Sequence, residues 1–162
     1  MIRYVIGDAT APVGDGPKII AHVCNDAGGW GAGFVLALSR RDRNPERVYR
    51  DSGHRLDTVS FANYGDPESR TIVANMVAQH GFGEDGEPPI RYPVLRECLR
   101  EVALAAIGKG ASIHMPRIGC GLAGGRWEEV SGIVEEACRG VLVTVYDLAP
   151  VPGTEYDSAG DR

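Results

Sequence analysis

Residues 19–33 read IIAHVCNDAGGWGAG and residues 112–125 read SIHMPRIGCGLAGG, so an apolar strand runs into a glycine-rich loop twice in this chain. A glycine-rich loop that opens a helix presents unpaired backbone N–H groups and the positive end of the helix dipole, and both favour a bound phosphate. One such loop is common in proteins. Two of them in one small domain predict a clamp that closes on both sides of a diphosphate.

The segments around these loops alternate between strand and helix patterns. Apolar runs bounded by turn residues predict strands at residues 2–6, 18–24, 58–61, 71–77, 111–117 and 141–146. Apolar residues at three- to four-residue spacing predict helices at 31–43, from 45 onward, at 95–106 and at 127–138. This alternation is typical of a layered α/β fold with a largely parallel sheet. Turn residues at 63–67 predict an antiparallel hairpin, which makes the sheet mixed.

The size and charge of the chain indicate one globular domain with no general attraction to polyanions. The chain has 162 residues, with 22 acidic and 17 basic side chains and a net charge of −5. This balance argues against a basic nucleic-acid groove or an anionic membrane as partner, although one terminal nucleotide needs no such groove. No stretch approaches the ~18–20 apolar residues of a membrane span. Residues 80–91 are predicted to form an exposed loop, and residues 149–162 a disordered tail.

The cysteines indicate a reducing compartment rather than a disulfide framework or a metal site. They are Cys24, Cys98, Cys120 and Cys138, and no two of them have the C-x-x-C spacing. We therefore expect buried thiols, a cytoplasmic protein and no bound metal.

Two familiar nucleotide-binding motifs do not fit. Residues 119–124 match G-x-G-x-x-G literally, and Asp147 follows at about the distance of a ribose-binding acid. The chain ends one strand later, however, which leaves no room for the second half of a doubly wound fold. Neither glycine loop is followed by G-K-[ST], which argues against a P-loop nucleotidase.

Several polar and aromatic residues have both a structural and a functional interpretation. Asn25 stands where α/β proteins bind ligands, and its amide either contacts a sugar hydroxyl or forms a local Asx turn. Asp8 either accepts a hydrogen bond from a base amine or caps a turn. Trp30 is interpreted as core packing under the first loop or as a recognition residue.

The histidines divide into buried and exposed positions. His22 lies within an apolar strand and is expected to be a core residue with its hydrogen bonds satisfied. His80 lies at the end of a strand beside the exposed loop. It is placed for proton transfer, unless it is simply a surface residue.

Several motifs of the chain resemble those of the macrodomain family. Gly7-Asp8-Ala9-Thr10 is similar to the family's G-D-I-T, and His22-Val23-Cys24-Asn25 stands where N-A-A-N often stands. Gly29-Trp30-Gly31-x-Gly33 and the run from Pro116 to Leu122, followed by Trp127-Glu128, resemble the branch of the yeast ADP-ribose phosphate phosphatase and the terminal ADP-ribose protein glycohydrolase. The match spans residues 1–148. It implies a three-layer α/β/α sandwich around a mixed sheet, with a cleft for ADP-ribose and no cofactor.

The resemblance also implies the ligand-binding residues. Asp8 would hold the adenine amine, Ala9 would offer a backbone N–H, and Asn25 would contact the distal ribose. The glycine loops would enclose the diphosphate and distal ribose through Gly28, Gly29, Trp30, Gly31, Gly33, Ile118, Gly119, Cys120, Gly121 and Leu122. The adenosine end would be lined by Tyr146, Asp147 and Leu148.

Two departures from the branch affect the expected chemistry. The glycohydrolases of the branch use a lysine where this chain has Gln79, and an aspartate where it has Ala123. Glutamine cannot form a Schiff base, so a covalent lysine mechanism is not available at this position.

We therefore expect a water-mediated hydrolase that removes ADP-ribose from carboxylate-modified proteins, with Asn25, Asp26, Gln79 and His80 as the candidate catalytic residues. A reader that binds ADP-ribose unchanged and a phosphatase acting on ADP-ribose phosphate are the alternatives.

Overall fold

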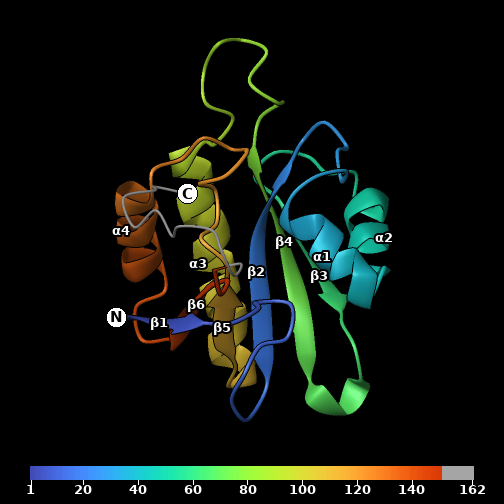
Figure 1. The fold of residues 1–162 in the computed structure, drawn as a ribbon, viewed down its shortest axis with the longest axis vertical. Coiled ribbons are helices and arrows are strands. Elements are labelled where there is room, and N and C mark those ends of the chain that lie inside the picture. Colours follow the sequence, from blue (N-terminus) through green and yellow to red (C-terminus); the bar gives the residue numbers. More distant parts are fainter. Residues whose placement is uncertain (151–162) are drawn as a thin grey trace.

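The computed structural model describes residues 1–150 and contains a six-stranded sheet with helices on both faces (Figure 1). The strands are β1 (Ile2–Ile6), β2 (Lys18–Asn25), β3 (Val59–Asn63), β4 (Thr71–Gln79), β5 (Ser112–Met115) and β6 (Val143–Asp147). The helices are α1 (Phe34–Arg41), α2 (Asn44–Asp51), α3 (Tyr92–Lys109), α4 (Trp127–Ala137) and the short 3-10 turn η1 (Pro67–Ser69). Each predicted strand and helix is present. The main differences are that β4 reaches Gln79, that α1 begins at Phe34 rather than at residue 31, that β5 covers four residues rather than 111–117, and that β6 begins at Val143 rather than at residue 141.

The sheet has the strand order β1-β6-β5-β2-β4-β3. Every neighbouring pair is parallel except β3 and β4, which form the predicted antiparallel hairpin, so the sheet is mixed as expected. The central strand β2 is buried along most of its length, because β4 and β5 flank it and helices cover both of its faces.

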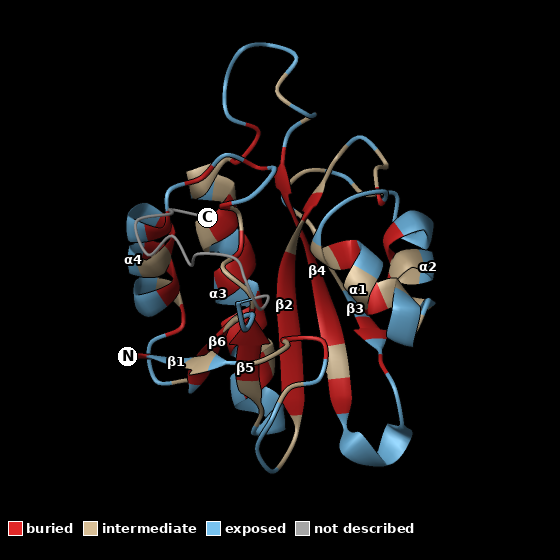
Figure 2. Cartoon of the chain, viewed as in Figure 1, coloured by how far each residue is buried: buried red, intermediate tan, exposed pale blue. Residues whose placement is uncertain are grey.

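The two faces of the sheet carry different cores (Figure 2). α3 and α4 cover the larger core, and the predicted helical stripe of α3 at Leu95, Leu99, Val102 and Ala106 is buried there. α1 and α2 cover the smaller core on the opposite face, which contains Tyr49. The chain is therefore the predicted three-layer α/β/α sandwich.

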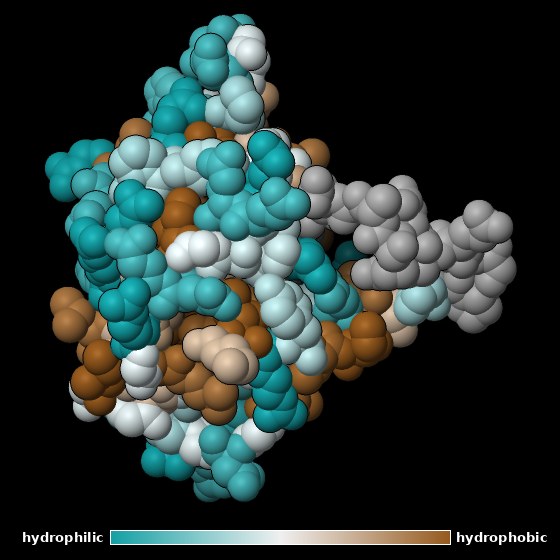
Figure 3. Space-filling model, turned by 90° about the vertical axis from the view of Figure 1, so that its left-hand side faces the viewer, coloured by the Kyte–Doolittle hydropathy of each residue, from teal (hydrophilic) through white to brown (hydrophobic). Residues whose placement is uncertain are grey.

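The outer surface over α4 is mostly polar, with apolar side chains gathered in its lower part (Figure 3). Exposed apolar residues of the chain include Leu104 and Ile107 of α3 and Leu142 just before β6. Among residues 1–150 the structure contains no helix with the length and hydropathy of a membrane span. The four cysteines are buried thiols, as predicted.

The parallel strands β2, β4 and β5 end at the same side of the sheet, and the connections that leave them there lie close together. Asn25 at the end of β2 is paired with Gln79 at the end of β4, after an irregularity in the register at Cys24. The segment 80–91 projects beyond this end (Figure 1). Most of it is exposed, as predicted, but Ile90 is buried and bridges back to Gln79. The predicted disordered tail lies, from residue 151, outside the described residues.

Candidate functional site

A cavity of about 590 Å³ opens at the ends of β2, β4 and β5. Its volume is within the range of about 300–1,000 Å³ that is usual for small-molecule sites. Both glycine loops contribute to its wall, as the sequence predicted. The lining residues are His22, Val23, Cys24, Asn25, Gly29, residues 31–35, Gln79, Phe82, residues 116–119 and residues 121–123.

Asn25 organises the first glycine loop. Its Nδ2 donates to the Gly29 carbonyl oxygen at 2.8 Å, while its Oδ1 accepts from the N–H groups of Ala27 at 3.0 Å and Gly29 at 2.9 Å. The Tyr49 hydroxyl donates to the Asn25 carbonyl oxygen at 2.6 Å. The local turn considered for Asn25 is therefore present, and a ligand hydroxyl would have to share an amide that already shapes the loop.

Trp30 anchors the same loop in the core rather than lining the cavity. The side chain is buried, its indole N–H donates to the Ser39 hydroxyl at 2.8 Å, and the ring packs edge-on against His22 and obliquely against Tyr49. The interpretation of Trp30 as core packing is confirmed. A ligand in the cavity would meet the neighbouring Gly29 and Gly31 instead.

The N-terminus of α1 meets the cavity directly. Gly33 precedes the helix with a φ of 81°, and Gly33, Phe34 and Val35 all line the cavity. The N–H groups of Gly31, Ala32 and Gly33 donate to no acceptor within residues 1–150. Unpaired N–H groups beside a helix N-terminus favour a phosphate or another anion.

The second glycine loop is closed by its own backbone. The Gly125 N–H donates to the Gly119 carbonyl oxygen at 2.7 Å, and the Gly124 N–H donates to the Gly121 carbonyl oxygen at 3.1 Å. Gly119, Gly121 and Leu122 line the cavity, whereas Cys120 is buried with its Sγ 3.3 Å from the Ile118 carbonyl oxygen. α4 begins only at Trp127, and its N-terminus does not line the cavity.

Arg117 is a cavity residue that the site prediction left out. Its guanidinium is bidentate to Asp147, with Nε–Oδ1 at 2.7 Å and Nη2–Oδ2 at 3.0 Å, and it lies over the rings of Tyr4 and Trp127. Such a fork holds the planar cation in one orientation. Its position directly after β5, inside the motif at Pro116, was the signal that could have identified it.

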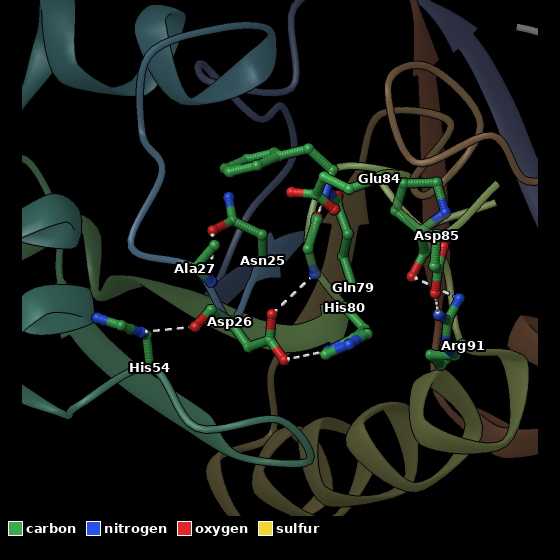
Figure 4. A network of polar contacts seen from close by, with 12 residues as sticks. Asn25, Asp26, Ala27, His54, Gln79, His80, Glu84, Asp85 and Arg91 are labelled. Carbon is green, nitrogen blue, oxygen red and sulfur yellow. Dashed lines mark hydrogen bonds and ion pairs between the residues drawn. The ribbon is translucent and has the colours of Figure 1, made fainter. Parts of the chain in front are cut away.

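Asp26 and His80 form a pair that lies outside the cavity lining (Figure 4). His80 Nδ1 is 2.7 Å from Asp26 Oδ2, and the Gly81 N–H donates to Asp26 Oδ1 at 2.8 Å. His54 Nδ1 contacts the Asp26 carbonyl oxygen at 3.1 Å. Partial burial alone would raise the pKa of Asp26, but the hydrogen bonds from Gly81 and His80 outweigh it and the pKa lies below its usual value.

Gln79 lines the cavity beside Asn25, so two of the four candidate catalytic residues are brought together there. Its Nε2 donates to the Gly81 carbonyl oxygen at 3.0 Å. Its Oε1 accepts no hydrogen bond from any residue that the structure describes. That oxygen is therefore available to a water molecule or a ribose hydroxyl.

Other predicted ligand-binding residues lie outside the cavity lining; they are Asp8, Ala9, Gly28, Trp30, Cys120, Tyr146, Asp147 and Leu148. Asp8 Oδ1 accepts hydrogen bonds from the Thr10 N–H at 2.8 Å and the Thr10 hydroxyl at 2.7 Å, so its turn-capping role is present. The Tyr146 hydroxyl accepts from the Val13 N–H at 3.0 Å and Leu148 is exposed. These positions stay predictions for a ligand that extends beyond the cavity.

His22 and Cys24 line the cavity but carry no charge near neutral pH. Burial lowers the pKa of His22 to about 4, although the contact of its Nε2 with Asn75 Oδ1 at 2.6 Å opposes that shift. Burial and the nearby Cys98 raise the pKa of the Cys24 thiol well above its usual value. His22 is thus the satisfied core histidine that was expected, and a buried thiol of this kind is a poor nucleophile.

Comparisons with known proteins agree with this architecture. No protein-family model matches the chain. The chain is 46% identical to a macrodomain protein from Streptomyces coelicolor, with a TM-score of 0.78 to its solved structure, and the match covers 91% of this chain and 99% of that one.

Two curated relatives differ strongly in length. The chain is 33% identical to the mouse "Chromodomain-helicase-DNA-binding protein 1-like" over 90% of its own length, but it spans only 17% of that relative. It is 22% identical to an "ADP-ribose 1''-phosphate phosphatase" from Lodderomyces elongisporus, a match that covers 83% of this chain and 91% of the relative.

Proposed function

This chain belongs to the macrodomain family, and we propose that its cavity binds ADP-ribose and hydrolyses the bond between ADP-ribose and a protein carboxylate. The observation that carries the proposal is the cavity between two glycine loops at the ends of three parallel strands, which is lined by residues 31–33 with their unpaired N–H groups. The yeast relative named as an ADP-ribose 1''-phosphate phosphatase supports the choice of ligand.

The diphosphate of ADP-ribose would lie between the two glycine loops. The first loop offers backbone N–H groups and the N-terminus of α1, and the second offers Gly121 and Leu122 from the opposite wall. Arg117 adds a positively charged guanidinium to the lining. Because the net charge of the chain is −5, the attraction for phosphate would be local to these groups.

The distal ribose would lie at the end of the cavity formed by Asn25 and Gln79. Gln79 would hold a water molecule with its Oε1 against the anomeric carbon. The water oxygen forms a bond to that carbon while the carbon–oxygen bond to the protein carboxylate breaks, and the water gives up a proton to solvent. Positioning of this kind contributes up to ~7–11 kcal/mol to a reaction between bound groups.

A reader that binds ADP-ribose and releases it unchanged is the second candidate. The described residues that line the cavity include no carboxylate and no lysine, and the Asp26–His80 pair lies outside the lining. General acid–base catalysis needs a group within hydrogen-bond reach of the proton that moves, or one water away from it. This arrangement favours binding without turnover if hydrolysis requires a strong base. Hydrolysis in this cavity therefore depends on a water molecule that reacts without one.

Chromatography of the products tests these possibilities. The protein is mixed with a glutamate-ADP-ribosylated target, and a sample without the protein controls for spontaneous ester loss. We expect release of free ADP-ribose, and we expect Gln79→Ala to slow that release at least tenfold while ADP-ribose still binds. Retention of the modified target on a column of this protein without any release would make it a reader, and release of phosphate from ADP-ribose phosphate would make it a phosphatase.

We also propose a cytoplasmic location. Support comes from the four buried thiols at Cys24, Cys98, Cys120 and Cys138, which suit a reducing compartment.

A further inference from the structure

Phe82 closes one end of the cavity although most of its ring is exposed to solvent. Its side chain lines the cavity, and the residue is 58% exposed. The ring lies directly over Gly29, because a methyl group built on Gly29 would lie 2.7 Å from the Phe82 Cζ atom. The neighbouring lining residues Asn25 and Gln79 belong to the same end of the cavity.

The backbone on both sides of Phe82 is held by specific hydrogen bonds. Asp26 binds His80 and the Gly81 N–H, and Gln79 Nε2 donates to the Gly81 carbonyl oxygen. The Phe82 N–H donates to Glu84 Oε2 at 2.9 Å. Figure 4 shows that Asp26 reaches from the first glycine loop to this segment. The ring is therefore positioned by the loop that it covers.

An exposed aromatic ring fixed at the mouth of the cavity suits a ligand group with an apolar face. The face of an aromatic ring carries partial negative charge, so a phosphate is not favoured beside it, whereas the C–H face of a sugar packs on it and buries apolar area. The unpaired N–H groups that suit phosphate belong to residues 31–33, whereas Asn25 and Gln79, which the proposed function places against the distal ribose, lie at the end that Phe82 covers.

We infer that Phe82 is a specificity-determining residue that packs against the distal ribose of ADP-ribose, and that Asp26 and His80 are positioning residues that hold it there. This inference rests on the proposed function, because it requires ADP-ribose in the cavity. Asp26 and His80 can fill this positioning role from outside the cavity lining. Direct participation in catalysis would require them to reach the reacting atoms inside the cavity.

Comparison of two ligands isolates the contribution of the ring. ADP lacks the distal ribose, so titration calorimetry with ADP-ribose and with ADP separates contacts to that sugar from contacts to the rest of the molecule. We expect Phe82→Ala to weaken ADP-ribose about tenfold, equivalent to about 1.4 kcal/mol, and to change ADP affinity less than twofold. Phe82→Tyr keeps the aromatic ring and should therefore keep the preference for ADP-ribose over ADP. Phe61→Ala on the edge strand β3, which removes a partly exposed ring that does not line this cavity, is the matched control.

A double-mutant cycle tests the positioning role. Asp26→Ala should lower the preference for ADP-ribose over ADP three- to fivefold in the wild-type background and have no further effect on it in the Phe82→Ala background. A structural weakening of the whole loop would instead lower the affinity for both ligands. Thermal unfolding of each variant identifies any that fail to fold, and Asp26→Asn, which keeps an oxygen for Gly81, then replaces Asp26→Ala.

The outcomes separate the two proposals. If the wild-type protein binds neither ligand, the proposed function fails. If it binds ADP-ribose but Phe82→Ala weakens both ligands equally or neither, the assignment of Phe82 is overturned while the proposed function stands. Additive effects of Asp26→Ala and Phe82→Ala on the preference would overturn the positioning role alone.

Discussion

The two glycine loops look alike in sequence but are stabilised in different ways. The first is held by side chains, because Asn25 spans it with hydrogen bonds and Trp30 anchors it through Ser39. The second is held by its backbone, through the bond from the Gly125 N–H to the Gly119 carbonyl oxygen. A helix begins directly after the first loop, whereas α4 begins beyond the second and away from the cavity. Only the first loop therefore adds a helix N-terminus to the site.

Gly125→Ala should have the largest effect, because it breaks the loop that depends on its backbone. A Cβ atom at residue 125 would lie 2.5 Å from the Gly119 carbonyl oxygen, and this contact cannot be relieved by turning a side chain. We expect the free energy of unfolding to fall by about 3 kcal/mol, as for a badly overpacked site. Urea unfolding measures it.

Gly121→Ala is the matched control in the same loop. A Cβ atom at residue 121 meets nothing within 4 Å, so we expect a change within about 0.5 kcal/mol. Equal destabilisation by the two variants would show that the loop tolerates no side chain anywhere, and would contradict the specific role of Gly125.

Acidification should loosen the loop that depends on side chains. His22 packs against Trp30, and burial lowers its pKa to about 4 from an ordinary value of 6.5. Between these two values the unfolded chain binds a proton that the folded one rejects, so stability is complete above pH 6.5 and falls as the pH drops toward 4. At 1.36 kcal/mol per unit the loss attributable to His22 is about 3 kcal/mol. Urea unfolding at pH 7 and pH 4 measures it.

His22→Gln separates this titration from that of other groups. Its amide can still donate to Asn75 Oδ1, but it does not titrate, so the variant should lose less stability than the wild type between pH 7 and pH 4. His114, whose pKa is also lowered to about 4 mainly by burial, contributes equally in both proteins. Identical pH dependences would refute the assignment to His22. Hydrogen exchange should increase first at the amides of Ala27 and Gly29.

Asn25→Ala tests whether side-chain hydrogen bonds hold the first glycine loop, and its expected effect on stability is smaller than those of Gly125→Ala and acidification. It removes the acceptor of the Ala27 and Gly29 N–H groups and the donor to the Gly29 carbonyl oxygen. We expect a loss of about 2 kcal/mol in the free energy of unfolding, because the two part-buried hydrogen bonds to Gly29 contribute about 1 kcal/mol each and the exposed one to Ala27 contributes little.

Because the first loop lines the cavity, Asn25→Ala should also weaken ADP-ribose at least tenfold. Asn63→Ala at the exposed end of β3 serves as the control for a general effect of losing an asparagine side chain. Unchanged ADP-ribose affinity in Asn25→Ala would show that the first loop keeps its shape without that side chain.

The sequence predicted the layered α/β fold and the pairing of β3 with β4 better than it predicted the site, whereas the order of the other strands came from the structure. Apolar runs and helical spacing depend on local composition, so β2, the β3–β4 hairpin and the stripe of α3 at Leu95, Leu99 and Val102 were all recognisable. Asp26 and His80 could not be placed relative to the cavity in the same way. Whether a side chain at the end of a strand turns inward or outward depends on the hydrogen bonds that the loop makes.

Phe82 and Arg117 are cavity residues that the sequence did not identify as part of the site. A phenylalanine in an exposed segment has many ordinary roles and does not by itself indicate a ligand. The motif at Pro116 drew attention to Arg117 but did not show what the guanidinium contacts. Their contribution depends on contacts with segments distant in the chain: Gly29 beneath Phe82, and Asp147, Tyr4 and Trp127 around Arg117.

The amino-acid sequence by itself determined a layered α/β fold, its mixed sheet and the presence of two glycine loops, because strand and helix patterns and glycine's conformational freedom are local properties. The three-layer α/β/α arrangement was implied by the resemblance to the macrodomain family. The tertiary structure alone decided that α1 rather than α4 turns its N-terminus to the cavity and that Gln79 faces it while Asp26 does not. It also decided that Phe82 covers Gly29. The reason is physical: these relations depend on distances between segments far apart in the chain, which packing and long-range hydrogen bonds set.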